Sequence, residues 1–381
     1  MIRFGAAALL ALLATGCRGN NTGSSNNVVA TAKVNLTGTS GCSTQTPGFG
    51  APVVAFTPQS LVPYVPAPSG AICAKATEPV AFLAIPGPAP GPAILRLDLD
   101  AGTMTPWVTA DRFAAFDPLV SNLTGIALLN ASGIASPDTL LVVDSSTNRI
   151  LAVTELSISA FAGISSVNGG FADGSVGSAL FRFTSPTQIA VGGNGDVYVP
   201  DPGNQRVRRI TGSFVSTLAG SGVPGFLDGI GTQARFDQPD SIAIECEGTL
   251  VVTEASHRVR RIRFISISSG FGGSSLSTIV TTVAGDGVAN TLDGTLGFAG
   301  GAETFSPGCI NVGRKGAASG ELFWIDRGSG ILRLVASGAT TVVSPYGAAS
   351  VPALSSFGLC GTSSGEALLV DSAGGQILRL P

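Results

Sequence analysis

The sequence predicts an all-β protein made of repeated units, of the kind found in propellers and solenoids. One unit is written twice in full, in residues 161–210 and again in residues 218–262. Internal repetition with a period of about 50 residues is typical of these architectures. The composition agrees, because glycine fills 52 of the 381 positions and only 12% of the residues are charged. Such a chain favours strands and turns over helices.

The end of the unit, a polar loop followed by a strand, can be traced along most of the chain. The apolar residue after the loop recurs six times, at Ile94, Ile150, Val207, Val259, Ile331 and Ile377. Each interval has room for four short strands and their turns, so each copy is predicted to form one blade. An arginine fills the penultimate slot in five copies, at Arg96, Arg209, Arg261, Arg333 and Arg379. We expect these arginines to be structural partners of neighbouring carboxylates or carbonyls.

An Asp-Gly pair recurs earlier in the unit, with the aspartates at Asp173, Asp228 and Asp293. This pair suits a tight turn in which the carboxylate caps nearby amides. A phenylalanine and a strand-opening proline follow, at Phe183/Pro186, Phe236/Pro239 and Phe305/Pro307.

Together these motifs resemble the NHL-repeat β-propellers. The resemblance is strongest over residues 161–310, with the pattern AG-x-G-xx-GF-x-DG…A-x-F…P-x-x-I-A-I…V-Y-V-x-D-x-x-N-x-R-V-R-R-I, and weaker copies extend it to about residues 81–380. It implies a β-propeller, for which we favour six blades. Five blades is the competing count, if the degenerate first copy is discarded.

The sixth copy stops at Leu380 and Pro381 and leaves no residues for its outermost strand. An N-terminal strand is therefore expected to close the ring. Two apolar segments could supply it, Val28–Leu36 and Ala51–Phe56. We favour Val28–Leu36, because its alternation suits a half-buried strand.

The N-terminus predicts export. A short cationic start and an apolar run of Phe4–Ala14, too short to span a bilayer, precede Thr15, Gly16 and Cys17. This resembles a bacterial lipoprotein signal with Cys17 as the lipidated residue; a plain secretory signal and a retained anchor are the alternatives. We therefore expect a signal peptide at 1–16, a tether at 17–50 and a propeller at 51–381. Arg18 after the cysteine, by resemblance to sorting signals, favours the outer membrane, reached through the lipid anchor alone.

Five other cysteines remain, and an oxidising compartment permits disulfides between them. Cys309 and Cys360 are a candidate pair, with buried free thiols as the alternative.

The sequence offers little catalytic chemistry. It contains no Gly-x-Ser-x-Gly elbow with an acid and histidine partner, no phosphate-binding loop and no placed dinucleotide motif. His257 is the only histidine, so zinc sites with two or three histidines are excluded and no metal or catalytic residue is assigned. The net charge of −3 argues against a nucleic-acid partner, in spite of the arginine clusters around Arg208 and Arg260.

The acidic residues leave an enzyme as the alternative function. A calcium-dependent hydrolase or lyase of the lactonase-like kind would need acidic and amide oxygens at the channel mouth. Most of the acids recur at fixed slots, which favours turn capping: Asp144, Asp201, Glu254, Asp326 and Asp371. Glu245 and Glu247 do not recur and are the least explained acids.

The predicted function is binding or scaffolding at the cell envelope, for a protein, peptide or glycan partner. The loops on one face of a propeller surround the channel, and function belongs to such a site. The candidate ligand face holds Arg149, Arg206, His257, Arg258 and Arg327. We expect no cofactor, with calcium as the one exception if the enzyme alternative holds.

Overall fold

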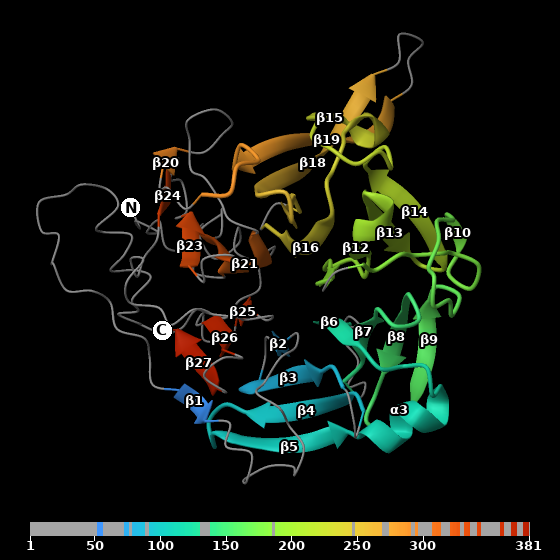
Figure 1. Cartoon of the computed structure of the whole chain (residues 1–381), viewed down its shortest axis with the longest axis vertical. Helices are drawn as coiled ribbons and strands as arrows, with labels where there is room; N and C mark the ends of the chain where they lie inside the picture. The colour runs from blue at the N-terminus through green and yellow to red at the C-terminus, as the bar shows by residue number, and fades with distance from the viewer. Residues whose placement is uncertain are drawn as a thin grey trace, which may run out of the picture.

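The computed structural model describes sixteen stretches of the chain. These are residues 52–55, 72–75, 78–87, 91–129, 138–184, 187–245, 248–268, 274–290, 294–295, 307–313, 321–327, 331–335, 341–343, 359–361, 367–371 and 376–380. Their strands form six antiparallel sheets of four or five strands, which lie around a common centre in Figure 1.

The first two sheets have four strands each, in order from the centre outward. Sheet 1 consists of β2 (Ile72–Ala74), β3 (Val80–Ile85), β4 (Ala93–Asp98) and β5 (Thr103–Val108). Sheet 2 consists of β6 (Leu123–Leu128), β7 (Leu140–Asp144), β8 (Arg149–Val153) and β9 (Ile158–Ala162). The helix α3 (Ala110–Phe116) joins the two sheets. Among the described residues, no helix is long and apolar enough to cross a membrane.

The next three sheets have five strands, because a short strand from the preceding crossover is added at the outer edge. Sheet 3 consists of β11 (Ala190–Val191), β12 (Val197–Asp201), β13 (Arg206–Thr211), β14 (Phe214–Ala219) and β10 (Gly174–Ser175). Sheet 4 consists of β16 (Pro239–Ile244), β17 (Leu250–Glu254), β18 (Arg258–Ser268), β19 (Ser274–Ala284) and β15 (Gly229–Ile230). Sheet 5 consists of β21 (Pro307–Gly313), β22 (Glu321–Asp326), β23 (Ile331–Val335), β24 (Thr341–Val343) and β20 (Gly294–Thr295). Two 3-10 turns occur in this part of the chain, η2 (Pro202–Asn204) and η3 (Gly231–Gln233).

Sheet 6 combines the two ends of the described chain. Its strands are β25 (Leu359–Gly361), β26 (Ala367–Asp371), β27 (Gln376–Leu380) and, at the outer edge, β1 (Pro52–Ala55). The favoured segment Val28–Leu36 lies outside the described residues, and the edge that we assigned to it is occupied by β1 from the second segment. Alternation alone does not decide between two segments that are both apolar enough to pair.

The innermost strands touch one another in sequence. β2 contacts β6, β6 contacts β11, and the contacts continue through β16, β21 and β25 back to β2. The architecture is therefore propeller-like, with the first and last sheets adjacent.

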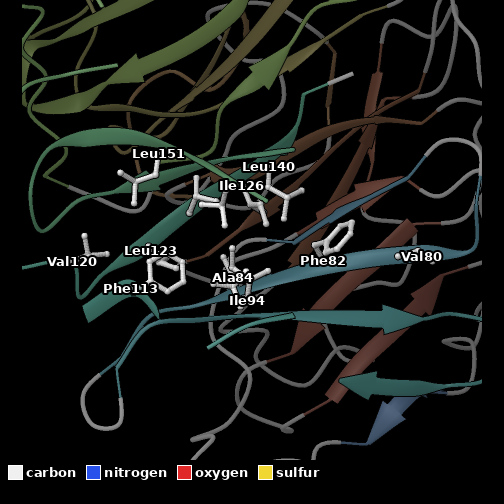
Figure 2. Close-up of a cluster of buried hydrophobic side chains, with 13 residues drawn as sticks. Val80, Phe82, Ala84, Ile94, Phe113, Val120, Leu123, Ile126, Leu140 and Leu151 are labelled. Carbon is white, nitrogen blue, oxygen red and sulfur yellow. The ribbon is translucent and has the colours of Figure 1, made fainter. Parts of the chain in front are cut away.

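The core lies between neighbouring sheets, and strand alternation explains how one strand serves two layers. In β3, Ala81, Leu83 and Ile85 pack in the cluster shared with sheet 6, whereas Phe82 and Ala84 pack in the cluster shared with sheet 2. Figure 2 shows this second cluster, to which α3 adds Phe113. A strand buried on both faces reads as a continuous apolar run, as Val80–Ile85 does.

The register of the sheets corrects two alignments made from the sequence. Arg333 lies opposite Trp324, two residues before the end of β22, and this is the slot of Arg208 rather than that of Arg209. The alignment assumed a shortened loop in sheet 5, but this loop is as long as that of sheet 3. Likewise, Phe181 rather than Phe183 corresponds to Phe236, since both are fully buried beneath an equivalent arginine.

Candidate functional site

All five residues of the predicted ligand face lie at one end of the sheets. Arg149, Arg206 and Arg258 are the first residues of the third strands β8, β13 and β18. His257 directly precedes Arg258, and Arg327 directly follows β22. The structure therefore places each of them in, or beside, a loop that joins a second strand to a third.

A buried arginine two residues into β13 organises the backbone beneath this face. Arg208 is fully buried and donates from Nη1 to Asp201 at 2.8 Å and from Nη2 to Asp173 at 2.7 Å. It also donates to the carbonyls of Leu180 and Ala172 at 3.0 and 2.7 Å. Burial raises the pKa of the Asp201 carboxyl, while the Arg208 charge opposes this shift.

Sheet 4 repeats the arrangement with Arg260. Its Nη1 donates to Glu254 at 2.8 Å and its Nη2 to Asp228 at 2.6 Å. Asp228 in turn accepts the backbone N–H of Thr282 at 3.1 Å, as Asp173 does for Thr217. These amides lie 44 and 54 residues away in the sequence, on the strands β14 and β19, so Asp173 and Asp228 cap amides of another strand, whereas the sequence predicted capping within their own turn. Asp293 lies outside the described residues. The ion pairs to a buried arginine were missed, although the Arg-Arg pairs in the two strongest repeats were a signal for them.

The neighbouring arginines also have structural partners, as predicted. Arg209 pairs with Asp196 at 2.5 Å, and Arg261 pairs with Glu245 at 2.7 Å. Glu245, one of the two unexplained acids, therefore serves as the partner of Arg261.

The three arginines that begin the third strands of sheets 2, 3 and 4 stack on phenylalanines of the preceding crossovers. Arg149 lies 5.1 Å from the ring centroid of Phe116. Arg206 lies 3.9 Å from that of Phe171, and Arg258 lies 4.4 Å from that of Phe226. We call these pairs stacked units 1, 2 and 3, in chain order.

The three units differ in how their charge is compensated. Arg149 forms an ion pair with Asp117 and lies 3.9 Å from Asp144. Arg206 donates to the carbonyls of Asn204 and Ser221, both at 3.0 Å. Arg258 donates to the carbonyls of Ser256 and Asp286 at 3.3 and 2.6 Å.

Within the part of the chain that is described, no carboxylate pairs directly with Arg206 or Arg258 at salt-bridge distance. Partial burial lowers the pKa of both guanidinium groups.

Each stacked unit also carries an exposed valine in the crossover that follows it. Val223 and Val288 each follow a glycine, Gly222 or Gly287, whose missing Cβ leaves the space that the Arg206 or Arg258 guanidinium occupies. Val167, Val223 and Val288 are 66%, 50% and 60% exposed. In units 2 and 3 an exposed aliphatic residue thus directly follows the glycine beside the arginine, whereas in unit 1 Ser165 and Ser166 stand at these two positions and Val167 comes one residue later.

His257 occupies the slot predicted for it. Its backbone φ is positive at 64°, as is that of the equivalent Asn148 and Gln205, both at 55°. In those two loops the side-chain oxygen accepts a backbone N–H of the next sheet, from Phe183 at 2.7 Å and from Gln238 at 2.6 Å. Burial and the neighbouring Arg258 lower the pKa of His257.

One buried acid at the centre was missed by the sequence analysis. Asp240 lies on the innermost strand β16, accepts the Thr253 hydroxyl at 2.6 Å and pairs with Arg327 at 2.9 Å. Burial raises the pKa of its carboxyl. Thr187 precedes Ala190 in sheet 3 by three residues, as Asp240 precedes the equivalent Ala243 in sheet 4, so the acid does not recur and repeat alignment gave it no weight.

Arg327 therefore already has an acidic partner in Asp240, as Arg149 has in Asp117. Among the described residues, no group of three or more His, Cys, Asp or Glu side chains is placed to hold a metal. Cys309 and Cys360 lie on the neighbouring innermost strands β21 and β25, and their pairing stays a prediction.

Comparison with known proteins supports the fold. No family model and no curated protein matches the chain. An auxiliary nutrient binding protein from Bacteroides thetaiotaomicron VPI-5482 is similar in structure, with a TM-score of 0.56 at 10% identity over 83% of this chain and 69% of that one. A second protein so described, from Bacteroides ovatus ATCC 8483, gives 0.54 at 12% identity over 86% and 70%.

A third match, from Bacteroides thetaiotaomicron VPI-5482 and provisionally described as a phosphatase, gives 0.54 at 13% identity over 82% and 71%. Since proteins with different descriptions match equally well, the likeness shows the fold alone. Fold and comparisons define the chain as a propeller-like β protein.

Proposed function

We propose that the chain is an exported lipoprotein whose residues 51–381 form one six-bladed propeller of the NHL kind. The unbroken series of contacts between innermost strands supports six blades, and the pairing of β1 with β27 supports closure by an N-terminal strand. Residues 1–16 would be removed as the signal peptide. Cys17 would carry the lipid at the outer membrane, and residues 17–50 would form the tether.

The proposed role is binding or scaffolding of a protein, peptide or glycan at the cell envelope. The observation that carries it is the pair of stacked units 2 and 3, in which Arg206 and Arg258 donate to backbone carbonyls and have no carboxylate at salt-bridge distance among the described residues. A carboxylate on a ligand is the natural partner for such a guanidinium, because charge-assisted hydrogen bonds are the strong ones. Arg149 and Arg327 belong to the same face but already have acidic partners within the chain.

The binding role is tested with the double variant R206Q/R258Q against defined anionic polymers, polyglutamate and polygalacturonate. Binding to at least one polymer should fall by about tenfold or more, because each lost charge-assisted contact contributes on the order of 1.5–3 kcal/mol. R209Q is the matched control, because Arg209 lies on the same strand as Arg206 but is paired with Asp196. Equal losses in R209Q and in the double variant would contradict a role for this face.

The calcium-dependent hydrolase alternative is separated by a thermal melt with calcium added or chelated. A ligand that binds only the folded state raises the melting temperature. We expect no shift. A rise of several degrees, followed by turnover of a lactone or ester, would replace the binding proposal with the enzyme.

A further inference from the structure

We infer that stacked units 2 and 3 together bind an extended peptide in which an acidic side chain and an aliphatic side chain alternate, one such pair to each unit. The inference rests on the proposed binding role and adds the class of partner. It depends on the groups that each unit presents, on the repetition of the unit and on the contrast with unit 1.

Each unit presents a cation and an aliphatic group next to each other. In unit 2, Arg206 lies against Gly222, and the next residue is the exposed Val223. In unit 3, Arg258 lies against Gly287, followed by the exposed Val288. A ligand that matches one unit must therefore carry a carboxylate close to an aliphatic group, as adjacent acidic and aliphatic residues of a peptide do.

The exposed valines of the units favour a peptide over a glycan. Arg206 covers one face of Phe171 at 3.9 Å from the centroid, and Arg258 covers one face of Phe226 at 4.4 Å, although Phe171 remains 44% exposed. Both units share the exposed valine, and aliphatic groups gain free energy by burying apolar area against apolar side chains. Aliphatic side chains of a peptide supply such area.

Repetition predicts that the ligand is bivalent. Units 2 and 3 are built by the same slots of sheets 3 and 4, which are consecutive in the ring. A ligand that reaches both gains effective concentration at the second unit, without any new kind of contact. A tandem ligand should therefore bind more tightly than a single copy.

Unit 1 supplies an internal control. Its arginine Arg149 also stacks on a phenylalanine, Phe116, but Asp117 already pairs with this arginine, and Ser166 stands where unit 2 has Val223, with the exposed Val167 one residue further along. An acidic side chain of a ligand would be repelled there, so V167S should not weaken binding.

The test uses fluorescein-labelled peptides with one or two Glu-Leu pairs, the two pairs joined by Gly-Ser linkers of graded length, and anisotropy as the readout. The tandem peptide should bind wild-type protein at least about tenfold more tightly than the single pair. V223S and V288S should each abolish that advantage, and V167S should preserve it. These valines are exposed, so the variants should keep the wild-type melting temperature, which is measured for each.

The remaining outcomes overturn the inference in distinct ways. Equal binding of Gln-Leu and Glu-Leu tandem peptides would show that the arginines do not contribute to binding. Equal binding of Glu-Gly and Glu-Leu tandem peptides would show the same for the valines. Binding of polygalacturonate alone, lost in R206Q/R258Q, would contradict the peptide while leaving the proposed role intact. Binding of no peptide and no polymer would contradict both.

Discussion

Sheets 2 and 3 are neighbours with the same strand order, but they are held together by different chemistry. Sheet 3 buries Arg208, which pairs with Asp201 and Asp173. In sheet 2 the equivalent slot holds Leu151, opposite Val142, and it packs in the same cluster as Phe113 of α3. The helix lies against β9 at the outer edge, where sheet 3 has the short strand β10.

Because sheet 2 has leucine where sheet 3 has arginine, the acid at the end of the second strand has different partners in the two sheets. Asp144 in sheet 2 is as buried as Asp201, but with leucine in the arginine slot it accepts hydrogen bonds from the hydroxyls of Ser146 and Thr147. Burial raises the pKa of both carboxyls. Two sheets with the same arrangement of strands can therefore be stabilised by apolar packing or by a buried ionic network, provided that each buried polar group keeps a partner.

The largest effect is expected when sheet 3 is given the leucine of sheet 2. R208L leaves the buried Asp201 without its cation and leaves two carbonyls without a donor. Breaking a buried pair on one side typically costs about 3–5 kcal/mol. The loss is measured as the change in free energy of unfolding by urea denaturation.

The triple variant R208L/D173N/D201N sharpens the same comparison. It removes the carboxylate charges together with the arginine, so that no uncompensated buried charge is left, and such a charge is what makes the loss of one partner so costly. We expect it to recover at least half of the stability lost in R208L. If R208L alone costs less than about 1 kcal/mol, the network does not hold sheet 3 together.

The second prediction concerns pH and the acid of sheet 4. Burial raises the pKa of Glu254 from an ordinary value of 4.5 to about 7, although Arg260 opposes the shift. The folded state therefore holds this proton more tightly than the unfolded state. The contribution is fully present below about pH 4.5 and is lost as the pH rises through about 7.

The readout is the difference in free energy of unfolding between wild-type protein and E254Q, measured from about pH 5 to about pH 8. Glutamine does not titrate, so this difference should fall by about 2–3 kcal/mol across the range. A difference that stays constant with pH would show that Arg260 keeps Glu254 ionised.

The repeat made much of this fold predictable from the sequence. Six copies of the loop and strand correspond to the six sheets, because a slot fixed by alternation keeps its residue type from copy to copy. The structural partners of Arg209 and Arg261 were predicted for the same reason. Sheet 1 was traced from its third strand β4 only, since its loop residues depart from the pattern.

Partners that are far apart in the sequence were not predictable in this way. Arg208 meets Asp173 across 35 residues, and Arg327 meets Asp240, an acid that occurs once. A recurring slot indicates that it has a role but does not identify its partner, and a residue without a repeat gives no such indication. For the same reason, the sequence did not distinguish between the five residues of the candidate face. In the structure, Arg149 and Arg327 pair with acidic residues, which sets them apart from Arg206 and Arg258.

A third prediction concerns Asp228, the partly exposed member of the ionic network in sheet 4. Asp228 accepts from Arg260 and from the backbone and hydroxyl of Thr282. In D228N the amide oxygen still accepts, but the charge is lost while Glu254 keeps Arg260 paired. We expect a loss of about 1–2 kcal/mol by urea denaturation. D173N is the matched change in sheet 3 and should cost a similar amount; a loss as large as that of R208L would show that the turn, not the arginine, is the main support.

The smallest effect is expected one residue away from the largest. Arg209 is partly exposed and pairs with Asp196, which also accepts a hydrogen bond from Asn194 at 2.7 Å. Because solvent screens such a pair, R209Q should cost about 1 kcal/mol or less, and the cost should shrink further in high salt. Urea denaturation at low and high ionic strength measures both. If R209Q and R208L proved equally costly, burial would not be what separates the two arginines, and the contrast between sheets 2 and 3 would need a different physical basis.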